Sequence, residues 1–196
     1  MGKGLGVLSV IVGALFAAFS GCGKSDDSGG AATLPQWPAR GLTVGDSVSG
    51  RVTQSTAART SSYSTFTEIV DRQPDGSSYR VDKYRVQPAG RVLESSQWQS
   101  AAVLFELQFE SRDDLAAKCA GLGGRMLALT LASGRTMETC RVVSRWMNGG
   151  VSGAGETYLG PVPFGIVRRQ WTSTDRTQKF QFEVTSYRAN GRTESL

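Results

Sequence analysis

Histidine is absent from the 196 residues of this chain. Ser-His-Asp and Cys-His catalysis are therefore excluded, and so is every metal site that needs an imidazole ligand. Gly150-Val151-Ser152-Gly153-Ala154 ends in Ala where a nucleophile elbow needs Gly, and no Ser stands three residues before a Lys. We predict no enzymatic activity, no catalytic residue, no metal and no cofactor. A hydrolase built from two carboxylates that are distant in the sequence is the alternative, because such pairs are defined in space.

Concentrated charge is also missing. The chain has 22 Lys and Arg against 17 Asp and Glu, a net charge of +5, and its longest basic cluster is Arg168-Arg169. A nucleic-acid-binding protein would show a basic stripe, so we predict no nucleic-acid partner. An Arg-rich, solvated strand surface is the favoured interpretation, with loose attraction to anionic lipid headgroups or polysaccharide as the alternative.

No apolar run is long enough to span a membrane. The longest, residues 5–19, has 15 residues, whereas a spanning helix needs about 18 or more. Lys3 precedes this run and is the only charge in the first 21 residues, and small residues follow it. This order is typical of a secretory signal peptide, which we predict over residues 1–21.

The end of this segment, Phe19-Ser20-Gly21-Cys22, resembles the bacterial lipobox, in which small residues precede a cysteine that is diacylated before cleavage. Phe19 stands where the lipobox usually has leucine. The resemblance implies that Cys22 is the lipidation site, the first mature residue and the attachment to a membrane. Gly23 after it fits sorting to the outer membrane on the enterobacterial pattern. An ordinary signal peptide or an uncleaved anchor is the alternative.

Removal of 21 residues leaves 175, which is enough for one domain with a hydrophobic core. Residues 22–43 are rich in Gly, Ser, Ala, Asp and Pro and show no hydrophobic periodicity, so we predict a lipidated, flexible tether there. Residues 44–196 are predicted to form one β-rich envelope domain.

Short alternating runs interrupted by turn residues predict an antiparallel sheet in this domain. Pro74-Asp75-Gly76 and Ala132-Ser133-Gly134 predict hairpin turns. Phe180, Phe182 and Val184 alternate with polar residues, as in a strand with one face in contact with water. We expect strands at residues 61–70, 78–86, 91–99, 102–110, 126–131, 136–143, 166–171 and 179–187.

One segment breaks the alternation and predicts a single short helix. Ser111 can cap it, Asp113-Asp114 lie in its first turn, and Gly121 can end it. Cys119 falls in its last turn and Cys140 on a predicted strand. In an oxidising periplasm a disulfide between them would close a loop with 20 residues between the partners and contribute about 3 kcal/mol. Since no His can activate a thiolate, we favour this disulfide over two free thiols.

Residues 129–142 and 158–168 resemble successive segments of periplasmic β-rich domains, the curved half-barrels of the LolA/LolB lipoprotein carriers. The resemblance covers roughly residues 124–187. It implies a mainly β (α+β) fold, a curved antiparallel sheet or half-barrel with one short helix, whose concave face can hold an acyl chain. Pro161 and Pro163 are expected to stiffen a turn. We expect an apolar ligand face, with core packing as the alternative, from the aromatic residues Trp98, Phe105, Phe109, Trp146, Phe164 and Trp171.

The expected function is that of a non-enzymatic lipoprotein of the bacterial cell envelope, anchored to the outer membrane through acylated Cys22 and facing the periplasm or the cell surface. It is expected to be a binding module for a lipid, a lipoprotein or another envelope protein. A structural surface lipoprotein without a ligand groove is the first alternative, and a hydrolase with a spatially assembled carboxylate site is the second.

Overall fold

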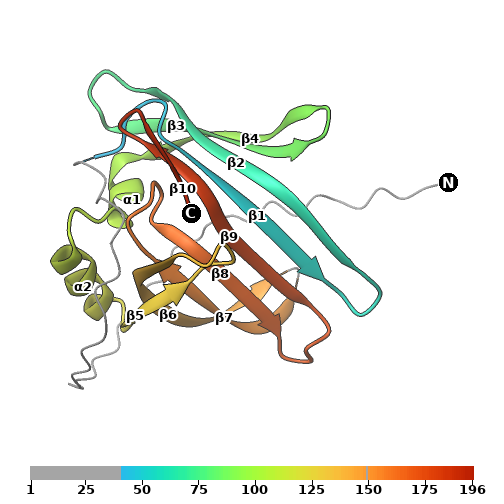
Figure 1. Cartoon of the computed structure of the whole chain (residues 1–196). Coiled ribbons are helices and arrows are strands. Elements are labelled where there is room, and N and C mark those ends of the chain that lie inside the picture. The colour runs from blue at the N-terminus through green and yellow to red at the C-terminus, as the bar shows by residue number, and fades with distance from the viewer. Residues whose placement is uncertain (1–40, 149) are drawn as a thin grey trace.

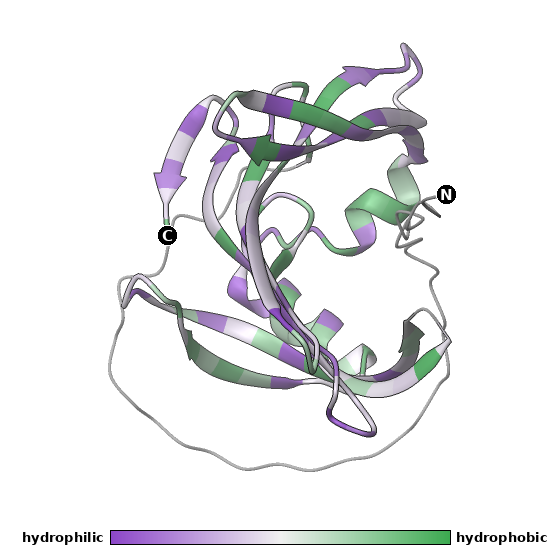
Figure 2. Ribbon diagram, turned by 90° about the vertical axis from the view of Figure 1, so that its right-hand side faces the viewer, coloured by the Kyte–Doolittle hydropathy of each residue, from purple (hydrophilic) through white to green (hydrophobic). Residues whose placement is uncertain are grey.

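The computed structural model describes residues 41–148 and 150–196. In this part of the chain, ten strands form one antiparallel sheet and two helices lie beside it (Figure 1). The sheet is strongly bent, so that its two ends lie above and below the helices (Figure 2). The predicted fold class, a mainly β curved antiparallel sheet, is confirmed. The elements are β1 (Ser47–Ser55), β2 (Thr60–Arg72), β3 (Ser78–Gln87), β4 (Gly90–Ser100), α1 (Ala101–Glu106), α2 (Arg112–Gly121), β5 (Arg125–Thr130), β6 (Thr136–Asn148), β7 (Val151–Leu159), β8 (Ile166–Ser173), β9 (Lys179–Ala189) and β10 (Arg192–Ser195).

The strand order is β4-β3-β2-β1-β9-β8-β7-β6-β5, with β10 paired to β9. Most neighbours follow each other along the chain and are joined by hairpins. The pairing of β1 with β9 is the exception, because it joins the first strand to one of the last. β8 pairs with the first half of β9, up to Glu183, and β10 pairs with the second half from Ser186 to Ala189. On this side of β9, the neighbouring strand therefore changes from β8 to β10.

Most of the predicted strands are confirmed. The two predicted hairpin turns join β2 to β3 and β5 to β6. Another hairpin joins β8 to β9, and its turn is closed by Asp175, which accepts hydrogen bonds from the Ser173 hydroxyl at 2.5 Å and the Thr177 amide at 3.1 Å. Local alternation and turn chemistry were sufficient to locate these elements.

The strand predicted over residues 102–110 is wrong, because residues 101–106 form helix α1. The Ser100 hydroxyl caps this helix and accepts a hydrogen bond from the Val103 amide at 3.4 Å. Leu104 is buried against Ile69, whereas Val103 is exposed. The buried residues follow helical spacing, and the alternation in the sequence concealed it.

The helix predicted after Ser111 is confirmed as α2. The Ser111 hydroxyl accepts a hydrogen bond from the Asp114 amide at 3.1 Å, and Asp113 and Asp114 lie in the first turn. Lys118 in the last turn donates to Asp114 at 3.1 Å. Neither α1 nor α2, the helices of the described residues, is long and apolar enough to cross a membrane.

The two faces of the sheet follow from the strand register, because directly opposed residues share a face. Val52, Phe182 and Arg169 oppose one another across β1, β9 and β8. The same register, followed through β7 to β6, places Cys140 on this face. Because Cys140 is bonded to α2, the helix lies on this side of the sheet, and we call it the inner face. Thr53 and Gln181 oppose each other on what we call the outer face.

Buried apolar residues form three clusters. The largest lies where β8 and β9 part, and includes Val167, Val184 and the C-terminal Leu196. The second lies under α1, and the third lies under α2 around the disulfide. Leu42 belongs to the second cluster, two residues before the predicted start of the domain.

Residues 160–165 connect β7 to β8 and enter the interior of the molecule. Pro161, Val162 and Pro163 are all almost fully buried. Phe164 packs against both the first and the second cluster. A Cβ at Gly165 would overlap the carbonyl of Leu107 in the link between the helices, and the φ angle of Gly165 is +67°. The predicted turn is thus also a buried wedge between the two halves of the sheet.

Candidate functional site

The predicted lipidation site, Cys22, lies outside the residues that the structure describes, and so does the predicted signal peptide. The structure joins Cys119 of α2 to Cys140 of β6 in a disulfide, with Cα atoms 5.5 Å apart. Both cysteines are buried with Leu115 and Leu159. The disulfide therefore holds the helix against the sheet.

The six aromatic residues expected on one ligand face lie in several places. Phe105 packs edge-on against Tyr79 under α1, with ring centroids 5.7 Å apart. Phe109, 2% exposed, lies in the cluster around the disulfide. Phe164 is the wedge residue described above. Trp98 of β4 is 49% exposed and opposes Arg80, which places it on the outer face.

The two remaining residues, Trp146 and Trp171, lie together on the inner face. Their rings stack with centroids 6.5 Å apart and planes inclined by 27°. Trp146 comes from β6 and Trp171 from β8, and the strand between them, β7, carries Gly153 and Gly155. A Cβ at Gly155 would overlap the Trp146 ring, and one at Gly153 would overlap the Trp171 ring. The two glycines thus form a floor on which the tryptophans lie.

This tryptophan pair has features that packing alone does not explain. Neither Trp146 nor Trp171 belongs to the three buried clusters. Trp146 is half-buried, and Phe180 and Phe182 beside Trp171 are half-buried as well. The indole N–H of Trp171 is buried and has no hydrogen-bond acceptor among the described residues. A buried donor without an acceptor is costly, which makes this indole a candidate ligand contact.

Arg169 lies two residues before Trp171 on the same face and was not predicted from the sequence. Its Nε donates to the Thr157 hydroxyl at 3.3 Å, and no carboxylate in the described ranges forms an ion pair with it. Burial lowers the pKa of its guanidinium. The alternation of Val167, Arg169 and Trp171 could have indicated an inward-facing cation, but we interpreted Arg168-Arg169 only as surface charge.

The outer face carries a second candidate site, a hollow of about 420 Å³ that extends across β1, β9, β8, β7 and β6. Residues that oppose one another on neighbouring strands form its floor. Thr53, Gln181 and Gln170 make one row, which continues to Glu156. The polar residues that line it are Thr53, Ser55, Glu156, Gln170, Thr172, Lys179 and Gln181.

Glu156 is held at the edge of this hollow by three donors. Gln170 donates to it at 2.6 Å and the Tyr158 hydroxyl at 2.7 Å, and Arg141 forms an ion pair with it. The Arg141 hydrogen bond is the main reason that the pKa of Glu156 lies below its usual value. Burial and the contact with Glu156 raise the pKa of Tyr158. Glu156 is therefore a stably ionised acceptor.

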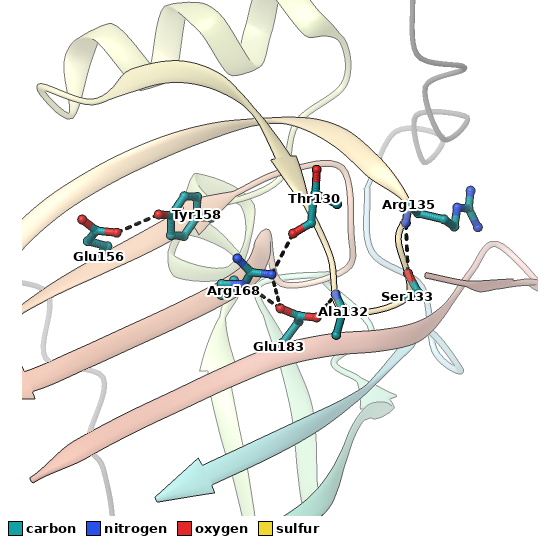
Figure 3. A network of polar contacts seen from close by, with 8 residues as sticks. All are labelled: Thr130, Ala132, Ser133, Arg135, Glu156, Tyr158, Arg168 and Glu183. Carbon is teal, nitrogen blue, oxygen red and sulfur yellow. Dashed lines mark hydrogen bonds and ion pairs between the residues drawn. The ribbon is translucent and has the colours of Figure 1, made fainter. Parts of the chain in front are cut away.

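A second carboxylate, Glu183, connects the sheet to the tip of the β5–β6 hairpin (Figure 3). It accepts a hydrogen bond from the Ala132 amide at 2.7 Å and another from Arg168 Nε at 2.6 Å. Arg168 also donates to the Thr130 carbonyl at 2.9 Å. Glu156 and Glu183 thus both have cationic partners. Among the described residues, no group of three or more Cys, Asp and Glu could hold a metal ion.

No protein-family model matches the sequence, and no curated protein matches it. Three solved structures are similar to this chain at 9 to 10% identity. One is a protein of Bacteroides fragilis described as exported, with a YmcC-like fold, which covers 82% of this chain and 100% of its own at a TM-score of 0.45. Another, from Vibrio parahaemolyticus, is described as an outer membrane lipoprotein-sorting protein domain, with 80% and 89% covered and a TM-score of 0.31.

The third is a DUF1329 family protein of Desulfovibrio piger, with 76% of this chain and 87% of that one covered and a TM-score of 0.31. At these TM-scores the likenesses carry no statement about what this chain binds.

Proposed function

We propose that this protein is a non-enzymatic lipoprotein of the bacterial cell envelope that binds an acyl chain of a lipid or lipoprotein on the inner face of its sheet. Cys22 is the proposed lipid anchor, residues 1–21 the proposed signal peptide and residues 22–43 the proposed tether. The anchor would hold the domain at a membrane surface, most simply the outer membrane. A ligand site on such a domain lies within reach of lipids and of other lipoproteins.

The observation that carries this proposal is the tryptophan pair on its glycine floor. Ligand sites for apolar molecules are lined by aromatic side chains with few polar groups. Trp146, Phe180 and Phe182 supply half-buried aromatic surface. Trp171 supplies a buried N–H without an acceptor, and Arg169 supplies a cation without a carboxylate. An amphiphile with an anionic or carbonyl-bearing head would cover the rings and satisfy both donors.

Native mass spectrometry of the purified protein with added palmitate tests this proposal. We expect one palmitate per chain, and a strong loss of occupancy in Trp146→Ala. Trp98→Ala removes the same type of side chain from the outer face and is the matched control, which we expect to bind normally. Trp146→Phe keeps an aromatic ring over Gly155 and should retain part of the binding, which separates loss of contact from loss of fold.

A bare mass at every palmitate concentration would contradict the proposal and favour the structural alternative, in which side chains of the protein itself fill the inner face. Equal losses in Trp146→Ala and Trp98→Ala would also contradict it, because the inner face would then have no special role.

A further inference from the structure

We propose that the hollow on the outer face is a binding site for an acidic oligosaccharide, that is, a sugar chain that carries carboxylate groups. This site is separate from the proposed acyl-chain site, because the two lie on opposite faces of the sheet. Its volume of about 420 Å³ lies within the range of about 300–1,000 Å³ that is typical of ligand sites.

Most side chains of the lining are polar, which suits a sugar better than an acyl chain. Thr53, Ser55 and Thr172 contribute hydroxyl groups, and Gln170 and Gln181 contribute amides. Hydroxyl and amide groups each donate and accept, as the hydroxyl groups of a sugar do. The apolar residues in the lining are Val143, Ala154, Trp171 and Phe180. Strand alternation places the Trp171 and Phe180 side chains on the inner face, so Val143 and Ala154, on β6 and β7, contribute the apolar side chains on this face.

Several of these polar groups retain hydrogen-bonding capacity. The Gln181 and Thr172 side chains make no hydrogen bond within the described residues. Gln170 uses its Nε2 on Glu156 and keeps its oxygen. Thr53 bonds the Ser62 hydroxyl at 3.0 Å, which leaves further positions on each oxygen. When no ligand is bound, water is the hydrogen-bond partner left for these donors and acceptors.

The charges around the hollow favour an anionic ligand. The charge of Glu156 is balanced by its ion pair with Arg141. Lys179 lines the hollow and Arg145 opposes Ala154 at its edge, and neither forms an ion pair within residues 41–148 and 150–196. Arg51 lies on the same face, one row from Thr53, and is likewise without an ion pair in these ranges. Three cations without a carboxylate partner thus adjoin the hollow, whereas Glu156, the carboxylate in its lining, is already paired with Arg141.

Isothermal titration calorimetry with trigalacturonic acid tests this site, with maltotriose as the neutral sugar of equal length. We expect the triuronate to bind, maltotriose to bind much more weakly, and added salt to weaken the triuronate. Lys179→Ala should lower the affinity about tenfold, because it removes a charge-assisted hydrogen bond. Gln181→Ala should lower it as well. Lys83→Ala removes an exposed lysine of β3 outside the hollow and should leave the affinity within about twofold.

The proposal fails if the triuronate gives no binding, if maltotriose binds equally well, or if Lys179→Ala and Lys83→Ala behave alike. Sedimentation with vesicles of anionic phospholipid is the second measurement. Vesicle binding that depends on Lys179 and is not displaced by the triuronate would identify this face as a membrane contact, and would also overturn the proposal. Palmitate binding to Lys179→Ala should be normal, because Lys179 lies on the outer face. If the oligosaccharide proposal fails, the acyl-chain proposal is therefore still tested separately by palmitate binding.

Discussion

At the scale of the residue, Glu156 and Glu183 are poorly suited to act as a hydrolytic carboxylate pair. A general acid needs a pKa raised toward the working pH, and a second carboxyl group must face it across the substrate. Glu156 instead accepts hydrogen bonds from Gln170 and Tyr158 and pairs with Arg141. Glu183 is paired with Arg168. Both groups are better described as acceptors that fix the positions of neighbouring side chains.

The lowered pKa of Glu156 makes stability depend on pH. Its folded pKa lies below the unfolded value of about 4.5. The stabilisation is therefore fully present above that pH and is lost as the pH falls through the folded pKa. We expect Glu156→Gln to be less stable than the unchanged protein at pH 7, and the difference to narrow toward pH 3. Urea unfolding across this range measures it.

Glu106→Gln, on the exposed side of α1, is the control, since the Glu106 carboxylate makes no hydrogen bond or ion pair with the described residues and should show no such dependence. A constant difference between Glu156→Gln and the unchanged protein from pH 7 to pH 3 would mean that the three donors act on the neutral carboxyl equally well.

At the scale of the element, the link between α2 and the sheet depends on one covalent bond, on the buried cluster around it and on a close approach of the backbone. A Cβ at Gly124 would lie 2.5 Å from the Cys140 sulfur, so the chain after α2 passes directly over the disulfide. Arg112 at the start of α2 forms an ion pair with Glu138 of β6 at 2.7 Å, but it is largely exposed. Exposed ion pairs contribute little, so we regard the disulfide and the buried contacts of Leu115 as the main attachment.

Removal of this disulfide should lower the free energy of unfolding by about 3 kcal/mol, because the loop that it closes is no longer constrained in the unfolded chain. The double variant Cys119→Ser/Cys140→Ser tests this by urea unfolding. Hydrogen exchange should show that the amides of α2 lose protection before those of β1 and β9. An unchanged midpoint, or a loss spread evenly over the sheet, would contradict this assignment.

The elements differ in how far the sequence could predict them. Turn residues and alternation are local, so the strands around Pro74-Asp75-Gly76 and the cap at Ser111 were found. Residues 102–110 were misassigned because Val103, Phe105, Leu107 and Phe109 alternate by chance. Phe105 packs in the cluster with Ile69 and Phe164, Phe109 packs in the cluster around the disulfide, and Val103 is exposed, so contacts with residues distant in the sequence decide which of them is buried. The glycine floor under the tryptophans escaped notice for the same reason, since it depends on the register of β6, β7 and β8.

The site shows the same division. The stacking of Trp146 on Trp171 depends on two hairpins coming side by side, and so does the row from Thr53 to Glu156. Residue type alone marked the aromatic candidates but could not separate the tryptophan pair from Phe105 or Phe109, which fill the core. The polar lining of the hollow consists of ordinary Thr, Ser and Gln, which carry no signal until the strands are aligned.

At the scale of the whole molecule, the proposed anchor makes a direct prediction. Cys22→Ser should prevent acylation and release the protein from the membrane fraction, because acyl chains contribute about 0.8 kcal/mol per buried CH₂ group. Cell fractionation and incorporation of labelled palmitate measure both effects. The control Cys119→Ser/Cys140→Ser removes the other two cysteines and should remain acylated and membrane-bound. Retention of Cys22→Ser in salt-washed membranes would identify the apolar run at residues 5–19 as an uncleaved anchor.

The pairing of β1 with β9 also governs when the domain can fold. Ser47–Ser55 must pair with Lys179–Ala189, so the centre of the sheet cannot close until nearly the whole chain has been synthesised. Domains dominated by such long-range pairings fold slowly, in milliseconds to seconds. A nascent chain that lacks its last strands remains open, and an open chain can be threaded through a translocation channel. For a protein that we propose to be exported, this late closure would delay folding until the chain has crossed the membrane.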